Sequence, residues 1–194
     1  MKLFGLFLIT IGISWSIEIG SEAPKFAAKD TNGEIHRLAD YKGKIVVLEW
    51  KNHGCPYVVK HYATDNMQAL QRELVDKGVV WFSILSSAPG KQGHVSTEEA
   101  NRIIADEKSA ASAALMDVAG VIGRRYSAKK TPHMFVIDKV GNLAYQGAID
   151  DNSSFFKSTV EGARNYVREA VSALISNETI AVPVTEAYGC SVKY

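Results

Sequence analysis

The two cysteines of this 194-residue chain are its residues best suited to covalent chemistry. Cys55 follows the apolar run Ile45–Trp50 and a short turn, Lys51–Gly54, and it precedes Pro56, a residue type favoured at the first position of a helix. Its sulfur is therefore expected to be exposed, at a place where unpaired amides and the positive end of the helix dipole lower a thiol pKa. We predict redox chemistry at this thiol; the alternative is a small, buried, apolar cysteine.

Cys190 lies near the end of the chain, directly after Gly189. A tail that turns at Gly189 would bring Cys190 to Cys55, where it would act as the resolving thiol of a disulfide exchange. Two alternatives stay open at this point. One is a structural disulfide that only pins the tail, and the other is a pair of free thiols.

Three ionisable side chains are candidates to assist Cys55. Glu49 lies six residues before it, and a carboxyl group buried in a central strand would be suited to general acid/base work; the alternative is a solvent-facing position. His53 and His133 would stabilise a thiolate or donate protons. Together with Cys55, these histidines would also suit copper or zinc.

The order of predicted elements indicates an α/β fold with parallel inner strands. Asn32-Gly33 predicts an N-terminal β-hairpin, and a capping box at Ser96–Glu99 predicts a helix through about Glu107. The helix from Pro56, with His61 on its surface, is expected to break near residues 64–66 and to restart from a cap at Asp65 with Gln68. Apolar spacing predicts strands over 44–50, 79–85, 112–116, 133–137 and 142–146, and helices over 118–126 and 156–174.

The N-terminal residues 1–16 have the pattern of an export signal, with Lys2, an apolar stretch and a small-x-small site at Ser14–Ser16. The alternative is an uncleaved membrane anchor. Residues 17–194 are predicted to form one domain, with 178–194 as a C-terminal tail. Without Lys2, basic and acidic residues are equal in number, so we expect no nucleic-acid partner, and membrane contact only through the signal segment.

The chain resembles the thioredoxin-like superfamily and, within it, the redoxin branch of peroxiredoxin-like proteins grouped with alkyl hydroperoxide reductase and thiol-specific antioxidant domains. The matching stretches are 48–58, 86–93, 131–138, 146–151 and 188–191. This resemblance implies a thioredoxin-like fold: a central mixed sheet with helices on both faces and an N-terminal β-hairpin extension. It also implies that Cys55 is the nucleophile, that Pro132 after Thr131 is the cis-proline beside it, and that Glu49 is a buried acid that moves protons.

The chain departs from the family pattern at three positions. Val58 stands where thioredoxins have the second cysteine of Cys-x-x-Cys, so Cys55 has no local resolving partner. Asn52 and Leu48 stand where peroxiredoxins have a threonine or serine and a proline. The hydroxyl that would bind a peroxide is therefore missing, which favours disulfide substrates, whereas the overall resemblance favours peroxides.

The sequence thus predicts an exported thiol-dependent oxidoreductase that acts on disulfides or hydroperoxides and needs an external thiol reductant, thioredoxin-like or glutathione-like. No cofactor and no metal are expected. The predicted catalytic residues are Cys55, Cys190, Glu49 and His53, and the predicted substrate-binding residues are Trp50, Asn52, Tyr57, Thr131, Pro132 and His133; core packing is the alternative for Trp50 and Tyr57. The alternative functions are a redox-inert binding module with a structural disulfide and a copper- or zinc-handling protein.

Overall fold

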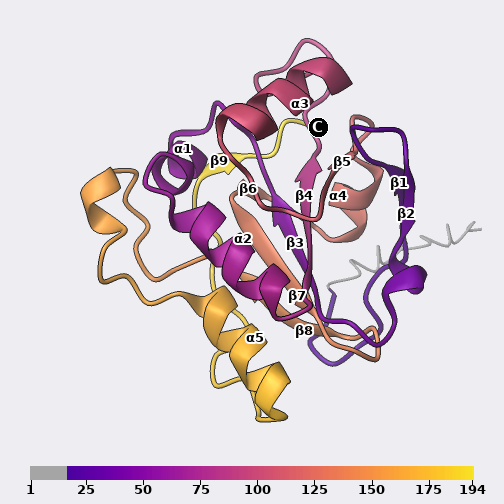
Figure 1. Ribbon diagram of the computed structural model, residues 1–194, viewed down its shortest axis with the longest axis vertical. Coiled ribbons are helices and arrows are strands. Elements are labelled where there is room, and N and C mark those ends of the chain that lie inside the picture. Colours follow the sequence, from indigo (N-terminus) through magenta and orange to yellow (C-terminus); the bar gives the residue numbers. More distant parts are fainter. Residues whose placement is uncertain (1–16) are drawn as a thin grey trace, which may run out of the picture.

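A five-stranded mixed sheet forms the centre of the protein in the computed structural model, which describes residues 17–194 (Figure 1). The strand order is β5-β4-β3-β7-β8. The inner strands β3, β4 and β5 are parallel, whereas β7 and β8 form a hairpin in which β7 runs antiparallel to β3. The bounds are Val46–Trp50 for β3, Val80–Leu85 for β4, Ala113–Met116 for β5, His133–Ile137 for β7 and Leu143–Gly147 for β8.

Helices cover both faces of this sheet, as predicted. One face packs against α1 (Pro56–Tyr62), α2 (Asn66–Asp76) and α5 (Tyr166–Ser176). The other face is covered by α4 and by the predicted N-terminal hairpin of β1 and β2 (Figure 1). The bounds are Ala27–Lys29 for β1, Ile35–Arg37 for β2, Thr97–Asp106 for α3 between β4 and β5, and Val121–Arg125 for α4; 3-10 turns span Leu38–Tyr41 and Lys157–Thr159.

Strand β3 is buried on both sides, and its residues alternate between two hydrophobic cores. Val47 contributes to the core beneath α1, α2 and α5, and Glu49 points to the same side. Val46, Leu48 and Trp50 contribute to the core on the opposite face. A side-chain period of two residues therefore decides which groups of β3 lie on the side of Cys55.

Several local signals form the structures that they predict. The Ser96 hydroxyl accepts a hydrogen bond from the Glu99 amide at 3.2 Å, and the Glu99 carboxylate accepts one from the Ser96 amide at 2.8 Å, so the capping box is present. The predicted break before α2 is also confirmed. Its cap is different, because Asp65 adopts a left-handed conformation and its carboxylate pairs with Arg72 instead of capping the helix.

The predicted first residue of the last helix was wrong. α5 begins at Tyr166, where the Asn165 side chain accepts a hydrogen bond from the Arg168 amide at 2.8 Å. The residues before Tyr166 do not continue the helix. Phe156 is exposed there, and Gly162 adopts a left-handed conformation that interrupts a helix, so the apolar spacing from Phe156 did not correspond to helical structure. A small antiparallel pair, formed by β6 (Lys130–Thr131) and β9 (Cys190–Ser191), was not predicted.

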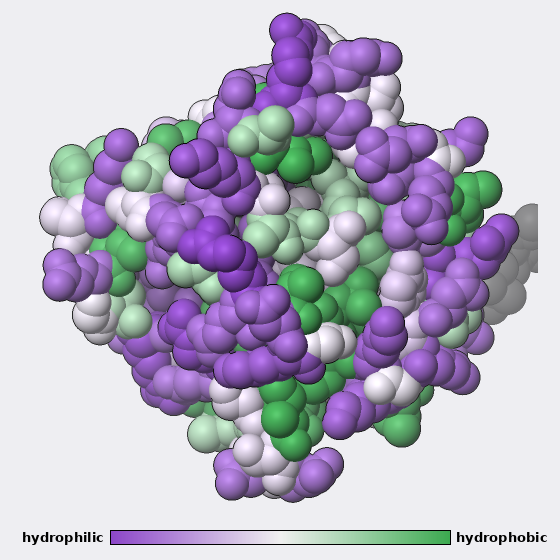
Figure 2. Space-filling view, in the orientation of Figure 1, coloured by the Kyte–Doolittle hydropathy of each residue, from purple (hydrophilic) through white to green (hydrophobic). Residues whose placement is uncertain are grey.

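The outer faces of the helices are mainly hydrophilic, with hydrophobic side chains grouped toward the middle of the face shown in Figure 2. Within residues 17–194, no helix has both the length and the apolar character that a bilayer crossing requires. The predicted export signal lies outside the described residues.

Candidate functional site: a buried dithiol at the start of α1

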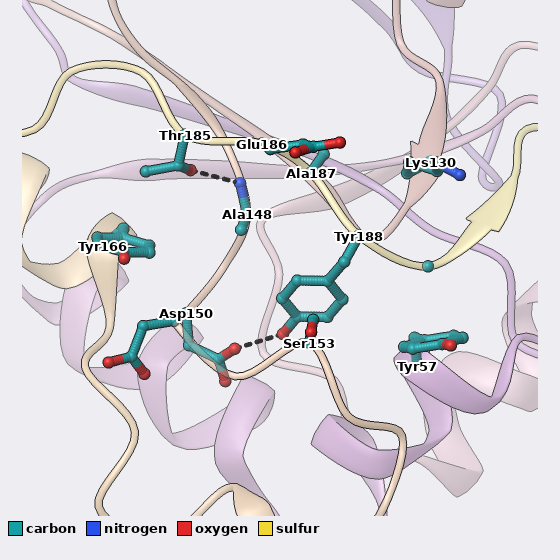
Figure 3. Close-up of a pocket in the computed structure, with 12 residues that line it drawn as sticks. Tyr57, Lys130, Ala148, Asp150, Ser153, Tyr166, Thr185, Glu186, Ala187 and Tyr188 are labelled. Atoms are coloured by element: carbon teal, nitrogen blue, oxygen red, sulfur yellow. Dashed lines mark hydrogen bonds between the residues drawn. The ribbon is translucent and has the colours of Figure 1, made fainter.

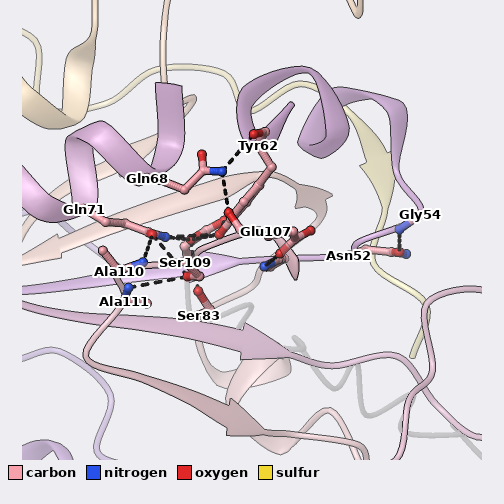
Figure 4. Close-up of polar contacts among 12 residues, drawn as sticks. Asn52, Gly54, Tyr62, Gln68, Gln71, Ser83, Glu107, Ser109, Ala110 and Ala111 are labelled. Atoms are coloured by element: carbon pink, nitrogen blue, oxygen red, sulfur yellow. Dashed lines mark hydrogen bonds and ion pairs between the residues drawn. The ribbon is translucent and has the colours of Figure 1, made fainter. Parts of the chain in front are cut away.

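Cys55 is the N-cap residue of α1, as predicted, and Pro56 occupies the first turn. The loop between β3 and Cys55 is held by Asn52. Its amide oxygen accepts a hydrogen bond from the Gly54 amide at 3.0 Å (Figure 4), and its nitrogen donates to the Gln92 side chain at 2.7 Å. Asn52 was predicted to contact substrate, but both ends of its amide are engaged within the protein. Its position supports a role in shaping the loop.

Three segments that are far apart in the sequence meet at the sulfur of Cys55. The thiol donates a hydrogen bond to the Thr131 carbonyl oxygen at 3.0 Å, and the Thr131–Pro132 peptide is cis. Thr131 pairs with Cys190 in the β6–β9 ladder. Gly189 adopts φ +120° there, and a Cβ atom at this position would collide with the Thr131 carbonyl, so a close approach of the tail requires glycine. The tail therefore brings Cys190 to Cys55.

The expectation that Cys55 is exposed was wrong. Its exposed fraction is 0 %, whereas Cys190 is partly exposed, and both thiols are reduced. The physical reason is the C-terminal tail, since Cys190 and Tyr188 pack against the core that contains Cys55. Cys190 is thus the outer sulfur of the pair.

The two thiols differ in acidity. Burial acts to raise the pKa of Cys55, but hydrogen bonds from Cys190, from the Thr131 side chain and from the Val58 amide outweigh it and lower the pKa. The buried Thr131 hydroxyl forms no hydrogen bond of ordinary geometry among the described residues, so it is uncommitted and free to serve the sulfur. Burial and the neighbouring Cys55 raise the pKa of Cys190 to about 11. The inner sulfur is therefore the one that ionises first.

We expect the ultraviolet absorbance of thiolate to rise in two steps during a pH titration, one below the ordinary cysteine range and one near pH 11. Because the steps belong to an interacting pair, Cys55→Ser should remove the first step and also shift the second to lower pH, since the charge that opposes ionisation of Cys190 is gone. A single step at an ordinary cysteine pKa would contradict this assignment.

Glu49 lies at the centre of a buried polar network on the same side of the sheet, and Figure 4 labels three of its partners, Tyr62, Gln71 and Ser83. Its carboxylate accepts hydrogen bonds from Tyr62 at 2.9 Å, Trp81 at 2.9 Å, Ser83 at 3.1 Å and Gln71 at 3.2 Å. Every partner is a donor. Among the described residues no hydrogen bond joins Glu49 to Cys55, so a proton-moving role for Glu49 stays a prediction.

The other predicted residues divide between the two sides of the sheet. His133 and Trp50 lie side by side in the β3–β7 register on the face opposite Cys55, where each packs on the Phe135 ring. Burial, followed by the charge of Lys129, lowers the pKa of His133 to about 4. The structure therefore does not bring His133 or Trp50 to the thiol, nor does it join His133 with Cys55 as ligands of one metal ion.

Tyr57 packs against the core that contains Cys55, and His53 lies in the turn between β3 and Cys55. Burial and then the charge of Lys51 lower the pKa of His53, so this imidazole is neutral at pH 7 and supplies no positive charge to a thiolate. The Tyr57 ring lies 6.0 Å from the Tyr188 ring of the tail. Tyr57 also lines a pocket of about 560 Å³ beside the tail, together with Lys130, Ala148, Asp150, Asp151, Ser153, Tyr166, Thr185, Glu186, Ala187, Tyr188 and Gly189 (Figure 3).

Sequence reasoning missed a buried polar cluster under the tail. His61, predicted on the surface of its helix, is fully buried, and Lys60 is 1 % exposed. They meet Asp150 and Tyr188, whose side chains are joined by a hydrogen bond in Figure 3. The only signal for these residues was that Asp150 and Tyr188 fall in stretches that carry the family resemblance.

Comparisons with known proteins agree with this fold. No curated protein matches the chain. An uncharacterized conserved protein from Geobacillus kaustophilus is 25 % identical, with a TM-score of 0.79 over 92 % of this chain and 93 % of the other. A hypothetical protein from Sinorhizobium meliloti is 20 % identical, with a TM-score of 0.78 over 92 % and 96 %.

A candidate thiol:disulfide interchange protein DsbE from Chlorobium tepidum is 22 % identical and has a TM-score of 0.59 over 82 % of this chain and 99 % of the other. At this identity the similarity shows the fold, which confirms the thioredoxin-like architecture. The model of the AhpC/TSA family matches residues 19–146, a range that contains β3, Cys55, Pro132 and β7. The chain therefore belongs to the AhpC/TSA family of thioredoxin-fold redoxins, which supports a role as an oxidoreductase.

Proposed function

We propose that this protein is an exported thiol-dependent oxidoreductase in which Cys55 is the nucleophile and Cys190 resolves the product. The observation that carries the proposal is the placement of the two cysteines at the N-terminus of α1: the Cys55 thiol donates to the Thr131 carbonyl oxygen, Thr131 pairs with Cys190 in the β6–β9 ladder, and the neighbouring Cys190 lowers the pKa of Cys55. The thiolate is the reactive form of cysteine, so the inner sulfur is poised for attack. The pattern of residues 1–16 supports export.

The two candidate substrates lead to the same oxidised protein. With a hydroperoxide, the Cys55 thiolate attacks the outer oxygen, the O–O bond breaks, the alcohol leaves with a proton, and Cys55 becomes a sulfenic acid. Cys190 then attacks that sulfur and water leaves. With a disulfide, Cys55 forms a mixed disulfide and releases one thiolate, and attack by Cys190 releases the other. Each route ends in a Cys55–Cys190 disulfide.

The geometry also suggests how an external thiol reductant regenerates the dithiol. In the disulfide, Cys190 is the sulfur nearer to solvent, so the first reductant thiolate attacks Cys190. The S–S bond breaks and Cys55 leaves as a thiolate, which is favoured because the thiol with the lower pKa is the better leaving group. A second reductant thiol then attacks the mixed disulfide, so that two reductant molecules are joined and Cys190 is released.

The direct test uses Cys190→Ser. With wild-type protein, one equivalent of hydrogen peroxide or of a small disulfide should consume both thiols and give a peptide that links Cys55 to Cys190. In Cys190→Ser the reaction should stop earlier, at a Cys55 sulfenic acid that dimedone captures or at a Cys55 mixed disulfide. Mass spectrometry of the digested protein measures both products, and the rates with peroxide and disulfide decide between the two substrate classes.

The redox-inert alternative is favoured by one observation, the complete burial of Cys55. It predicts that Cys55 in the folded protein reacts with neither oxidant at a rate above that of the unfolded chain. Modification of Cys190 alone by these oxidants would support this alternative and would contradict the proposed role of Cys55.

A further inference from the structure

Four polar side chains from three segments form a buried cluster that the proposed chemistry does not use. Lys60 and His61 come from α1, Asp150 from the loop after β8, and Tyr188 from the tail, two residues before Cys190. The exposed fractions are 1 % for Lys60, 0 % for His61 and 3 % for Asp150. Burial of ionisable groups is costly unless they are paired, so such a cluster calls for an explanation.

The hydrogen bonds of the cluster run in one direction toward Asp150. The Asn66 amide nitrogen donates to Nδ1 of His61 at 2.8 Å, which places the ring proton on Nε2, facing the Tyr188 hydroxyl at 3.2 Å. The Tyr188 hydroxyl in turn donates to Oδ1 of Asp150. His61 is neutral, because burial and then the charge of Lys60 lower its pKa to about 3, so this order of donors holds at neutral pH.

Lys60 also contacts this cluster, through its ammonium group. Its ammonium group donates to the Asn152 carbonyl oxygen at 2.8 Å and lies 5.0 Å from the centre of the Tyr188 ring, a cation–π contact. The Asn152 amide donates to Oδ1 of Asp150 at 3.1 Å. The Tyr188 side chain is therefore held by its hydroxyl and by its ring.

Near Cys190 the tail is also held through its backbone: the Val192 amide donates to the Lys129 carbonyl oxygen at 3.1 Å, and the Ala88 amide donates to the Lys193 carbonyl oxygen at 2.8 Å. β9 is only two residues long. Thr185 is bonded to the Ala148 amide three residues before Tyr188, and Tyr194 is bonded to the Ala128 carbonyl at the end of the chain. Between these two points, Tyr188 is the residue whose side chain anchors the tail to the face that carries Cys55.

We propose that Tyr188 is a positioning residue, and that its attachment to Asp150, His61 and Lys60 forms a latch that holds Cys190 against Cys55 and closes Cys55 to solvent. The proposal rests on the proposed function for its consequence in catalysis. The closure of Cys55, however, is a property of the reduced protein that is measured without any turnover.

The test compares Tyr188→Phe with the matched control Tyr194→Phe. Each variant loses one tail hydroxyl, on either side of Cys190, and keeps the ring. In Tyr188→Phe we expect alkylation of Cys55 by iodoacetamide in the folded, reduced protein to become about tenfold faster, the factor that corresponds to one lost hydrogen bond. Formation of the Cys55–Cys190 disulfide after oxidation should become slower by a similar factor. Tyr194→Phe should stay within about twofold of wild type.

A second variant separates the latch from general destabilisation. Asp150→Asn keeps an oxygen that accepts the Tyr188 hydroxyl, so its rates of Cys55 alkylation and disulfide formation should lie closer to wild type than those of Tyr188→Phe, even where its thermal unfolding temperature is lower. Wild-type rates in Tyr188→Phe, or equal rates in Tyr188→Phe and Tyr194→Phe, would overturn the latch. Full turnover by Cys55→Ser would overturn the proposed function and leave the alkylation result to decide the latch.

Discussion

Replacement of Cys55 by serine is expected to lower thiol-coupled turnover of hydroperoxides and small disulfides by about 10³-fold or more, as loss of the group that forms the covalent intermediate does in other enzymes. The serine hydroxyl is nearly isosteric with the thiol and can still donate to the Thr131 carbonyl oxygen, so the fold should persist. The pKa of the serine hydroxyl is far too high for it to ionise and replace the thiolate as the nucleophile. Turnover is measured with dithiothreitol as the reductant, which removes any dependence on the physiological partner.

Cys190→Ser is the matched control for this result. It keeps Cys55 and its place at the N-terminus of α1, and dithiothreitol can resolve the intermediate in place of Cys190. We therefore expect reduced but measurable turnover, with the first chemical step retained. Equal activities of wild type and Cys55→Ser would contradict the nucleophile assignment. A loss in Cys190→Ser as large as in Cys55→Ser would show that resolution by Cys190 is required for turnover.

Replacement of Glu49 by alanine is expected to lower the free energy of unfolding by about 2–6 kcal/mol, because each buried donor that loses its acceptor costs about 1–3 kcal/mol. The change would leave the Tyr62 hydroxyl and the Trp81 indole N–H, both fully or almost fully buried, without their acceptor. Urea unfolding monitored by tryptophan fluorescence measures the loss. Glu178→Ala, at an exposed glutamate in the tail, should change stability by less than about 0.5 kcal/mol.

Glu49→Gln tests whether this residue also serves the thiol. Glutamine keeps the length of the side chain but replaces one acceptor oxygen by a donor, so one of the surrounding donors loses its partner and some stability is lost. If Glu49 moves protons for Cys55, the low-pH step of the thiolate titration and the pH dependence of turnover should shift. An unchanged titration together with lower stability would make Glu49 a structural residue only.

The position of Cys55 is readable from the sequence because its determinants are local. Within about a dozen residues the chain has an apolar strand, a four-residue turn and a proline at the first helical position. Each of these features depends on the backbone preferences of the residues that form it. The capping box at Ser96 and the Asn32-Gly33 hairpin are local in the same way, and both are present. Propensities of this kind do not depend on what the rest of the chain does.

It was harder to predict on which face of the sheet each side chain lies. Trp50 and Glu49 are neighbours in sequence but point to opposite faces of β3, and His133 follows Trp50 because these two residues are paired across β3 and β7. A strict alternation from Glu49 would have placed Trp50 away from the thiol. The register that carries His133 to that same face comes from strand pairing across more than eighty residues.

The sequence by itself determined the α/β architecture, the thiol at the start of α1 and the presence of a second cysteine in the tail. Only the tertiary structure decided that the tail covers Cys55, that Cys190 is the outer and less acidic sulfur, and that Lys60, His61, Asp150 and Tyr188 form one buried cluster. The reason is physical: strand and helix starts depend on backbone preferences over a few residues, whereas burial and pKa depend on which distant segments exclude water from a group.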